Sequence, residues 1–325
     1  MKAMFRTHYG PPDVLQLQEI EKPVPADNEV LIRVRAVSVN PLDSFVLRGW
    51  LSSLPAISRM LEPKQKVIGS DIAGRVEALG SQAKQFRIGD DVMGCKNAGG
   101  LAEYVCITEK NLGPKPANLS YEQAAAVPVA AITALQALRD HGEIHAGQSV
   151  LIDGASGGVG TFAVQIAKSY GAIVTAVCST RQVETARSLG ADHVIDYSKD
   201  DFAQNGQKYD LILGANAHHS IFAYRRALKP HGVFVMVGGA MGRIFQAMLL
   251  GPILSRLGGR KFRFFIAKMT TNDLTILQGL LEAGKIAPVI DRIYPFPDAV
   301  AAFLYREEGH ARGKVVITID TVDAS

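Results

Sequence analysis

The sequence predicts a two-domain α/β protein in which a β-rich domain accompanies a doubly wound parallel sheet. Two observations predict this class. At 325 residues the chain is about twice the usual length of one domain. Its first third consists of short alternating strands separated by glycine and proline, whereas residues 148–239 alternate continuous apolar runs with helical segments. The second pattern is typical of parallel strands that are buried on both faces of a sheet.

In the first domain, residues 1–122, the predicted strands are 30–39, 72–78 and 91–93. Ser120 and Gln123 have the spacing of a capping box and predict the start of a helix. In the second domain, residues 123–265, helices are predicted over 160–170, 181–190 and 221–228. The strands between them are expected at 149–153, 172–178, 193–197, 210–215 and 232–239.

The C-terminal part of the chain, residues 266–325, is expected to return to the first domain. It should contain helices over 272–284 and 298–305 and a closing strand over 314–319. The preceding segment 260–268, RKFRFFIAK, could be a nucleic-acid patch, but alternating burial favours a strand at the domain crossing. We expect no internal repeat and no low-complexity linker.

Composition limits the function classes. Hydrophobic residues make up 47% of the chain, which excludes wholesale disorder. The net charge of +4 is weak and dispersed, so we expect no nucleic-acid partner. The cysteines, Cys95, Cys106 and Cys178, have no CxxC spacing and predict no disulfide framework. Cys106 and Cys178 lie within apolar strands and should be small core residues. A reducing, cytoplasmic location follows as an expectation.

No signal peptide or membrane span is predicted. Lys2 and Arg6 stand in an N-terminal segment without an apolar core. The longest apolar stretch, 244–257, contains Gln246, Pro252 and Arg256 and is shorter than the ~20 residues that a spanning helix needs. This stretch is better interpreted as a helix or loop that covers a pocket or a subunit contact.

The glycine-rich turn after the strand 149–153 carries the clearest functional signal. Residues 155–160, ASGGVG, match the dinucleotide-binding pattern G-x-G-x-x-G except that Ala155 replaces the first glycine. Gly157 would let the backbone approach a pyrophosphate, and Gly160 would allow close packing of helix on strand. The free N–H groups at the start of the helix attract phosphate. A purely structural turn is the alternative, but the flanking strand and helix favour a nicotinamide cofactor.

The choice between NAD and NADP depends on the end of the next strand. An NAD enzyme places an acid there, on the adenosine ribose. Here Ser179, Thr180 and Arg181 follow the strand. The hydroxyls can donate to a 2′-phosphate and Arg181 can pair with it, although Arg181 could also be an ordinary exposed residue. The pattern favours NADP(H).

At this point the sequence resembles the medium-chain dehydrogenase/reductase superfamily, in its zinc-independent quinone oxidoreductase branch. It is most similar there to the chloroplast-envelope quinone oxidoreductase-like and enone reductase group. The resemblance covers essentially the whole chain. It rests on GPPDVLQLQEIEKPVP, VLIRVRAVSVNPLD, GSDIAGRVEALG, FRIGDDVMG, GGLAEYV, AAAVPVAAITALQAL, GASGGVG, SLGADHVIDY and EEGHARGKVVI, which occur in family order. It implies a GroES-like substrate domain, a Rossmann domain for the cofactor and a cleft between them.

The resemblance also implies site residues. Asn40 matches an active-site asparagine near the nicotinamide and is the one residue expected to be catalytic. The expected cofactor-binding residues are Asn40, Thr133, Ser156, Gly157, Gly158, Val159, Ser179, Thr180, Arg181, Tyr197, Val237, Gly238, Gly239, Gly313 and Lys314. One position departs from the enone reductases, which often carry a cofactor-contacting lysine where this chain has Phe45. Asp43 could donate a proton or could cap a helix.

Metal ligands are not expected. Zinc members of the superfamily have a cysteine before N-P-x-D and a Gly-His-Glu motif, whereas this chain has Ser38 or Asn40 and then Gly69-Ser70-Asp71. The cluster of cysteines that holds a structural zinc is also missing, so a tetrahedral zinc site is not predicted. Without zinc, oxidation of a simple alcohol would lack its Lewis acid.

These observations predict an NADPH-dependent enzyme that transfers hydride to quinones or α,β-unsaturated carbonyls. Two alternatives stay open: an NADPH-binding protein with little catalysis, and a zinc-type alcohol dehydrogenase with unusual ligands. The expected partners are a small-molecule quinone or enone and a second copy of the chain. The resemblance implies a homodimer joined through the last strand of the Rossmann sheet, which we place at 232–237.

Overall fold

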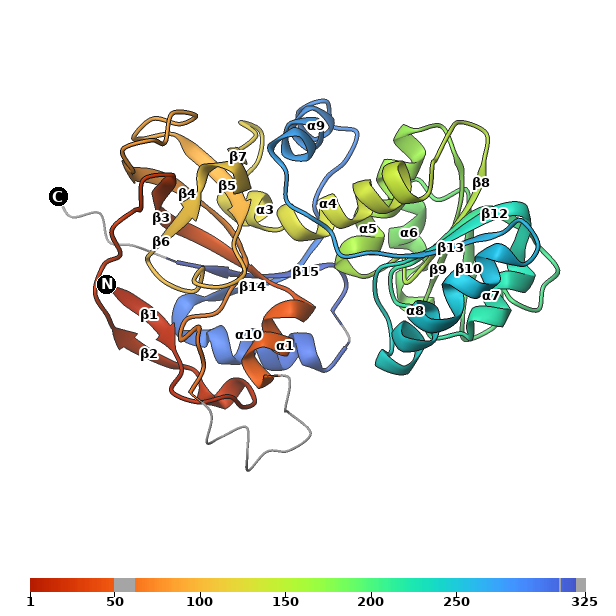
Figure 1. Ribbon diagram of the computed structural model, residues 1–325, viewed down its shortest axis with the longest axis horizontal. Helices are drawn as coiled ribbons and strands as arrows, with labels where there is room; N and C mark the ends of the chain where they lie inside the picture. The colour runs from red at the N-terminus through yellow and green to blue at the C-terminus, as the bar shows by residue number, and fades with distance from the viewer. Residues whose placement is uncertain (50–61, 310, 320–325) are drawn as a thin grey trace. The chain divides into compact units, whose positions relative to one another are not determined.

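The computed structural model describes residues 1–49, 62–309 and 311–319 of the chain, which divides into two compact units (Figure 1). Unit 1 takes in Met1–Val129, Met269–Glu282 and Pro288–Ser325, so far as these are described, and unit 2 takes in Ala130–Lys268 and Ala283–Ala287. Unit 1 is rich in β-strands and unit 2 is built on a parallel sheet. The predicted α/β class is therefore confirmed.

Unit 1 contains a seven-stranded sheet in the order β14-β15-β3-β4-β5-β7, with β6 paired to the first half of β3, and a separate hairpin of β1 and β2. The strands are β1 (Lys2–Phe5), β2 (Gln16–Glu19), β3 (Glu29–Val39), β4 (Asp71–Leu79), β5 (Asp91–Cys95), β6 (Tyr104–Thr108), β7 (Leu112–Pro114), β14 (Ile290–Pro295) and β15 (Lys314–Thr318). Its helices are α1 (Pro41–Arg48), α3 (Tyr121–Ala125), α9 (Thr271–Glu282) and α10 (Ala299–Glu307).

Strand β3 is the centre of unit 1 because it pairs with β15, β4 and β6. Its apolar residues join those of β4, β15 and α10 in one core. The register places Ser38 opposite Asp71 and Asp71 opposite Cys95, in a row across three strands. Polar side chains from strands far apart in the sequence therefore come together at one edge of the core.

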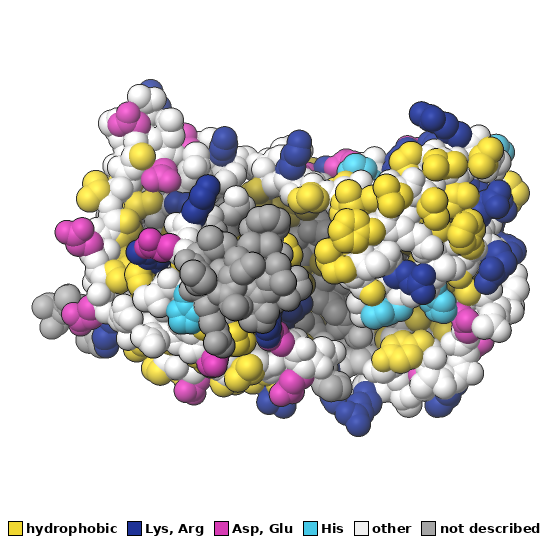
Figure 2. Space-filling model, turned by 60° about the horizontal axis from the view of Figure 1, so that its bottom comes forward, with side chains coloured by type: hydrophobic (Ala, Val, Ile, Leu, Met, Phe, Trp, Pro, Cys, Tyr) yellow, Lys and Arg dark blue, Asp and Glu magenta, His cyan; other side chains and the backbone are white. Residues whose placement is uncertain are grey.

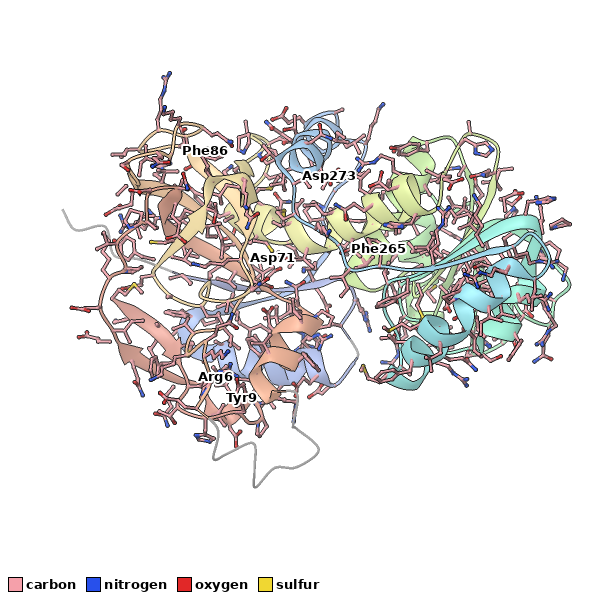
Figure 3. The ribbon with its side chains drawn as sticks, in the orientation of Figure 1. Arg6, Tyr9, Asp71, Phe86, Phe265 and Asp273 are labelled. Carbon is pink, nitrogen blue, oxygen red and sulfur yellow. The ribbon has the colours of Figure 1, made fainter. Side chains whose placement is uncertain are left out.

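Arg6, which follows strand β1 of the N-terminal hairpin, forms hydrogen bonds with helix α1. Its side chain is 1% exposed and donates hydrogen bonds to the carbonyls of Val46 (2.8 Å) and Leu47 (2.7 Å). The guanidinium also lies 4.8 Å from the centre of the Tyr9 ring, and Figure 3 labels the two side chains close to one another. Because these carbonyls belong to the last turn of α1, a buried arginine here satisfies acceptors that the helix leaves open.

Unit 2 contains a six-stranded parallel sheet in the order β10-β9-β8-β11-β12-β13. The strands are β8 (Ser149–Asp153), β9 (Ile173–Cys178), β10 (His193–Asp196), β11 (Tyr209–Gly214), β12 (Leu228–Met236) and β13 (Lys261–Phe264). The helices are α4 (Pro128–Gln136), which begins in unit 1, α5 (Gly158–Ser169), α6 (Val183–Ser188), α7 (Ile221–Ala227) and α8 (Met241–Arg256). The predicted alternation of strand and helix is confirmed.

The prediction that residues 232–237 form the last strand of this sheet is wrong. Strand β12 pairs on one side with β11 and on the other with β13, so residues 232–237 lie inside the sheet. The basic aromatic segment supplies the edge strand, since Lys261–Phe264 runs parallel to β12 after the long helix α8. The long apolar run of β12 made it the best candidate for the last strand in the sequence. The short β13 is only partly buried, as an edge strand should be.

Two of the cysteines are core residues, as expected. Cys106 lies in β6 and Cys178 in β9, and both are buried. Burial raises the pKa of each of these thiols to about 11. They therefore stay protonated and unreactive at neutral pH.

Candidate active site

The glycine-rich turn of unit 2 joins strand β8 to helix α5 at the carboxyl edge of the sheet. Gly154 has a φ of +84°, which bends the chain out of the strand, and Gly157 precedes the first helical residue. The amide of Thr161 donates to the Gly157 carbonyl at 2.9 Å, so the amides of residues 158–160 have no carbonyl within the helix to bond. These N–H groups and the positive end of the helix dipole form a site for a phosphate group.

The glycines of this turn have two different roles. A Cβ on Gly160 would lie 2.1 Å from the Gly154 carbonyl oxygen and 2.7 Å from the Ala155 Cα, so helix and turn touch there without room for a side chain. A Cβ on Gly157 would meet only the Gly154 oxygen, at 3.7 Å. Nothing in unit 2 requires glycine at 157, which leaves that side of the turn open to a ligand.

The residues expected around the adenosine end lie at the carboxyl ends of the neighbouring strands β9 and β10. Arg181 is exposed, and Tyr197 is 65% exposed, with its amide bonded to the Cys178 carbonyl at 3.1 Å. Thr180 donates its hydroxyl hydrogen to Asp196 at 2.7 Å. This bond, with further bonds from Ser198, lowers the pKa of Asp196 to about 2.

Asp196 was not recognised from the sequence. It ends strand β10, in the segment HVIDY. This strand is the neighbour of β9, after which an NAD enzyme would have its acid. Because Thr180 already donates to this carboxylate, its hydroxyl could donate to a 2′-phosphate only by giving up Asp196. The carboxylate also brings a negative charge to the pocket that Arg181 would have to offset.

The other expected cofactor residues of unit 2 lie at the same sheet edge or on helix α4. Residues 237–239 follow β12, and a Cβ on Gly238 would lie 2.5 Å from the Ala215 carbonyl oxygen, so this turn packs tightly on the loop after β11. Thr133 is half-buried on α4. Ser156 precedes the start of α5 and is also half-buried.

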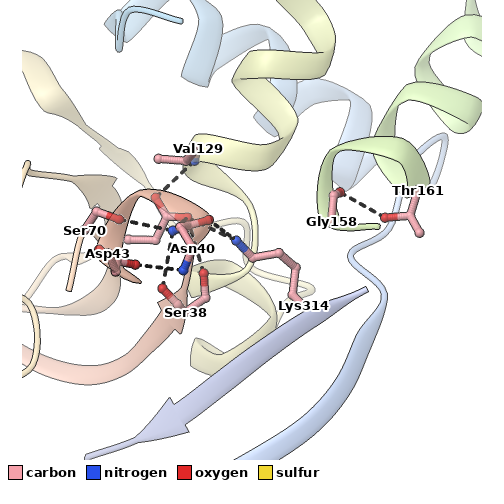
Figure 4. A network of polar contacts seen from close by, with 9 residues as sticks. Ser38, Asn40, Asp43, Ser70, Val129, Gly158, Thr161 and Lys314 are labelled. Atoms are coloured by element: carbon pink, nitrogen blue, oxygen red, sulfur yellow. Dashed lines mark hydrogen bonds and ion pairs between the residues drawn. The ribbon is translucent and has the colours of Figure 1, made fainter. Parts of the chain in front are cut away.

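In unit 1, Asn40 and Lys314 come together in a buried polar cluster (Figure 4). Asn40 is 2% exposed, and its side-chain amide donates to Asp71 at 2.9 Å and to Ser70 at 3.1 Å. Its oxygen accepts from the Lys314 ammonium at 2.6 Å. The whole side chain is therefore engaged inside unit 1, and its clearest role is to position Lys314.

Asp71 is the counter-ion of Lys314 in this cluster. Its carboxylate lies 3.4 Å from the Lys314 ammonium and accepts the amide hydrogen of Val129 at 3.0 Å. Burial raises the pKa of Asp71 and lowers the pKa of Lys314, while the charge of each residue opposes the shift of the other. Gly313, next to Lys314, has a φ of +120° and no room for a Cβ, which would lie 2.3 Å from the Val289 carbonyl oxygen.

Asp43 caps helix α1, which is one of the two roles considered for it. Its carboxylate accepts the amide hydrogen of Asn40, the residue before the helix, at 2.7 Å. Burial is the main cause that raises the pKa of Asp43 to about 7; the Asn40 bond lowers it and the nearby Asp71 raises it. Asp43 therefore gains a proton on folding over part of the acidic range.

We expect Asp43→Asn to flatten the pH dependence of stability. An unfolded aspartate titrates near pH 4, so the raised folded pKa gives the wild type a stabilising contribution below about pH 4 that is lost as the pH rises through about 7. Three pKa units correspond to about 4 kcal/mol. Asparagine keeps an acceptor for the Asn40 amide and cannot ionise.

The measurement is urea unfolding of wild type and variant at several pH values between 4 and 8. The difference in the free energy of unfolding should shift by several kcal/mol in favour of the variant as the pH rises. Asp13→Asn, at an exposed position, is the control and should follow the wild type. Parallel curves for all three proteins would show that Asp43 does not titrate in this range.

These two units define a dinucleotide-binding oxidoreductase architecture, which combines a β-rich domain with a parallel sheet that carries a glycine-rich phosphate turn. The profile of the family described as "Alcohol dehydrogenase GroES-like domain" matches residues 26–117. A second profile, described as "Zinc-binding dehydrogenase", matches residues 189–317.

Similar proteins have oxidoreductase names. The 2-methylene-furan-3-one reductase of Solanum lycopersicum is 37% identical, over 98% of this chain and 79% of its own length. The chloroplastic NADPH-dependent alkenal/one oxidoreductase of Arabidopsis thaliana is also 37% identical, with the same coverage. The solved quinone oxidoreductase of Coxiella burnetii matches with a TM-score of 0.86 and 31% identity, over 98% of this chain and 99% of that one. The chain belongs to the medium-chain dehydrogenase/reductase family.

The zinc named in the second family description does not fit the donors in unit 1. The region where zinc members have cysteine and histidine contains the hydroxyls of Ser38 and Ser70 and the carboxylate of Asp71. The Lys314 ammonium lies 3.4 Å from that carboxylate and would repel a divalent cation. Among residues 1–49, 62–309 and 311–319, no three His, Cys, Asp or Glu side chains are grouped as metal ligands.

Proposed function

We propose that this protein is an NADPH-dependent oxidoreductase that reduces quinones or α,β-unsaturated carbonyls without zinc. The observation that carries the proposal is the turn at Gly157, whose open side and free helix amides suit a dinucleotide phosphate. Support comes from the names of the similar proteins, which are reductases of enones, alkenals and quinones.

The proposed cofactor would be held by residues at the carboxyl edge of the unit 2 sheet. The amides of residues 158–160 bind its pyrophosphate, and the turn at 237–239 with Thr133 bounds the nicotinamide end. When bound, the reduced nicotinamide supplies a hydride to the acceptor. The residues of this chain contribute orientation and exclusion of water rather than acid or base chemistry.

Lys314 is the cationic group that we propose near the acceptor oxygen. Its ammonium donates to Asn40 and lies near Asp71, and in the described part of the chain no other residue accepts its third hydrogen. A fixed positive charge stabilises an oxygen that gains negative charge as hydride arrives. Asn40 and Asp71 are positioning residues in this scheme because they act through Lys314.

The acceptor class follows from the donors available. In a zinc-dependent alcohol dehydrogenase the metal stabilises the alkoxide, and the cluster around Lys314 does not supply zinc ligands. A quinone or an enone accepts hydride more readily, and its product oxygen can take a proton from water. Phe45, exposed on α1 where related enone reductases often have lysine, makes quinones the better supported class.

The test follows NADPH absorbance with a benzoquinone and with an alkyl vinyl ketone, and in parallel NADP⁺ reduction with a primary alcohol. We expect turnover of the quinone or the enone and little with the alcohol. Asn40→Ala should lower kcat while the protein remains folded, since it removes the bond that positions Lys314. Alcohol oxidation with inert quinone and enone would refute the proposal, and cofactor binding without any turnover would favour a non-catalytic role.

A preference for NADPH over NADH belongs to the proposal and depends on Arg181. We expect Arg181→Ala to weaken NADPH binding roughly tenfold to a hundredfold, because it removes a charge-assisted hydrogen bond to the 2′-phosphate. NADH binding should change little. Asp196→Asn is the complementary variant, because it removes the competing negative charge and should strengthen NADPH binding. Fluorescence titration with both cofactors measures this. Equal losses for NADPH and NADH in Arg181→Ala would show that this arginine does not bind the 2′-phosphate.

A homodimer and a cytoplasmic location are further parts of the proposal. Strand β13 has one edge that no strand in the described part of the chain pairs with, and we propose that this strand joins two sheets edge to edge. Light scattering at micromolar concentration distinguishes dimer from monomer. None of the described helices is long and apolar enough to cross a membrane. One similar protein is named as chloroplastic, so a cytoplasmic location needs a direct measurement.

A further inference from the structure

A hollow in unit 2 is lined by four cationic side chains and one aromatic ring. It has a volume of about 380 Å³ and is formed by Lys208, Phe222, Arg225, Arg226 and Arg260. These residues come from three separate places in the sequence: the segment before β11, helix α7 and the segment before β13. Because β11 and β13 begin at this edge of the parallel sheet, the hollow lies opposite the glycine-rich turn, which follows the carboxyl end of β8.

The four positive charges have no acidic partner among residues 1–49, 62–309 and 311–319. In the described part of the chain, no carboxylate forms an ion pair with any of them; their hydrogen bonds go to backbone carbonyls instead. Lys208 donates to the Arg226 carbonyl, Arg260 to the Leu228 carbonyl at 3.2 Å, and Arg225 to the Leu257 carbonyl at 3.5 Å. The formal net charge of the whole chain is +4, so this one hollow holds as much excess positive charge as the entire protein.

Arg225 also has a donor that the protein leaves unsatisfied. Its Nε–H is buried and has no hydrogen-bond partner. A buried donor without a partner costs free energy, and a guanidinium without a counter-ion costs more. Some other cations of unit 2 are paired with carboxylates, as Arg263 is with Glu143 at 2.6 Å and Lys229 with Asp210 at 2.8 Å. The cations that line the hollow have no such carboxylate in the described part of the chain, so a bound anion would offset charge that is otherwise uncompensated.

We propose that this hollow binds a phosphate monoester at a site separate from the cofactor turn. Planar guanidinium groups pair with phosphate through two hydrogen bonds at once, and four cations suit a dianion better than a single carboxylate. The volume exceeds that of a bare phosphate, and Phe222, 46% exposed, offers an apolar contact to the organic part of an ester.

The phosphate group could belong to a soluble ester or to the headgroup of an anionic lipid. Helix α8, which packs against α7, has apolar side chains exposed along its length, with Leu249 at 71%, and Leu257 at its end accepts the Arg225 bond. Figure 2 shows hydrophobic side chains gathered on a face of the protein with Lys and Arg side chains at its margin. Such a neighbourhood would suit a lipid, so both sources are tested.

Calorimetric titration with phenyl phosphate tests the site itself. Lys208→Gln/Arg226→Gln should bind at least tenfold more weakly than the wild type. The matched control, Arg187→Gln/Lys285→Gln, removes one arginine and one lysine from exposed positions elsewhere in unit 2 and should bind like the wild type. Lys208→Arg keeps the charge and should also bind normally. Equal affinity in both double variants would overturn the proposal, as would no binding by the wild type.

Sedimentation with phosphatidylcholine vesicles, with and without phosphatidic acid, then separates the two sources. Binding only to vesicles with phosphatidic acid, lost in Lys208→Gln/Arg226→Gln and in Leu249→Ser, would assign the site to a lipid headgroup. Phenyl phosphate binding without vesicle binding would assign it to a soluble ester. Leu249→Ser should leave phenyl phosphate binding unchanged in either case. Neither assay requires turnover or NADPH, so the outcome does not depend on the proposed function.

Discussion

Lys314→Met is expected to lower the free energy of unfolding by about 3–5 kcal/mol, which is the usual cost of removing one partner from a buried ion pair. Lys314 is 3% exposed and Asp71 is fully buried. Methionine fills a similar volume but leaves the Asp71 carboxylate without its counter-ion and the Asn40 oxygen without its donor. Urea unfolding of the wild type and the variant in the same buffer measures the loss.

A double variant separates lost charge from lost packing. Lys314→Met combined with Asp71→Asn removes both charges, so its loss should be smaller than the sum of the two single losses. Asparagine can still accept the Val129 amide hydrogen that Asp71 accepts at 3.0 Å. If the losses simply add, the two side chains do not interact energetically. An effect of Lys314→Met below about 1 kcal/mol would mean that the charge is not buried as the structure has it.

Much of the fold could be predicted because its signals are local. Continuous apolar runs with glycines between them identify the parallel strands, and Ser120 with Gln123 identifies the start of α3, where both capping bonds are present. The error concerned the edge of the sheet. Strand β13 has four residues, two of them basic, and only its pairing with β12 makes it a strand. Pairing between segments separated by a long helix leaves no local signal.

The candidate site was predictable to a similar degree. The glycine-rich motif predicted roles for Gly157 and Gly160, and the family resemblance predicted one for Asn40, because each residue belongs to a short contiguous pattern. It did not show that Asn40, Asp71 and Lys314 form one hydrogen-bonded cluster, because these residues are joined through the register of β3, β4 and β15. Asp196 was missed for the same reason: it lies beside Thr180 only because β10 pairs with β9.

The glycines of the phosphate turn allow stability and cofactor binding to be separated. Gly160→Ala should cost roughly 1–3 kcal/mol in stability, since its Cβ would lie 2.1 Å from the Gly154 carbonyl oxygen and helix α5 must move away from the turn. The displaced helix amides would then no longer converge on a phosphate, so NADPH binding should be lost as well. Urea unfolding and fluorescence titration measure the two effects in the same protein.

Gly157→Ala is the matched variant and should affect binding alone. Its φ of −80° suits alanine, and the added methyl group would be 3.7 Å from its nearest neighbour, so stability should stay within about 0.5 kcal/mol of the wild type. The same methyl group would occupy the open side of the turn, where we propose that the pyrophosphate lies, and NADPH affinity should fall by roughly tenfold or more. Normal NADPH affinity in Gly157→Ala would place the cofactor elsewhere, whereas a stable Gly160→Ala protein would mean that α5 and the turn do not pack closely.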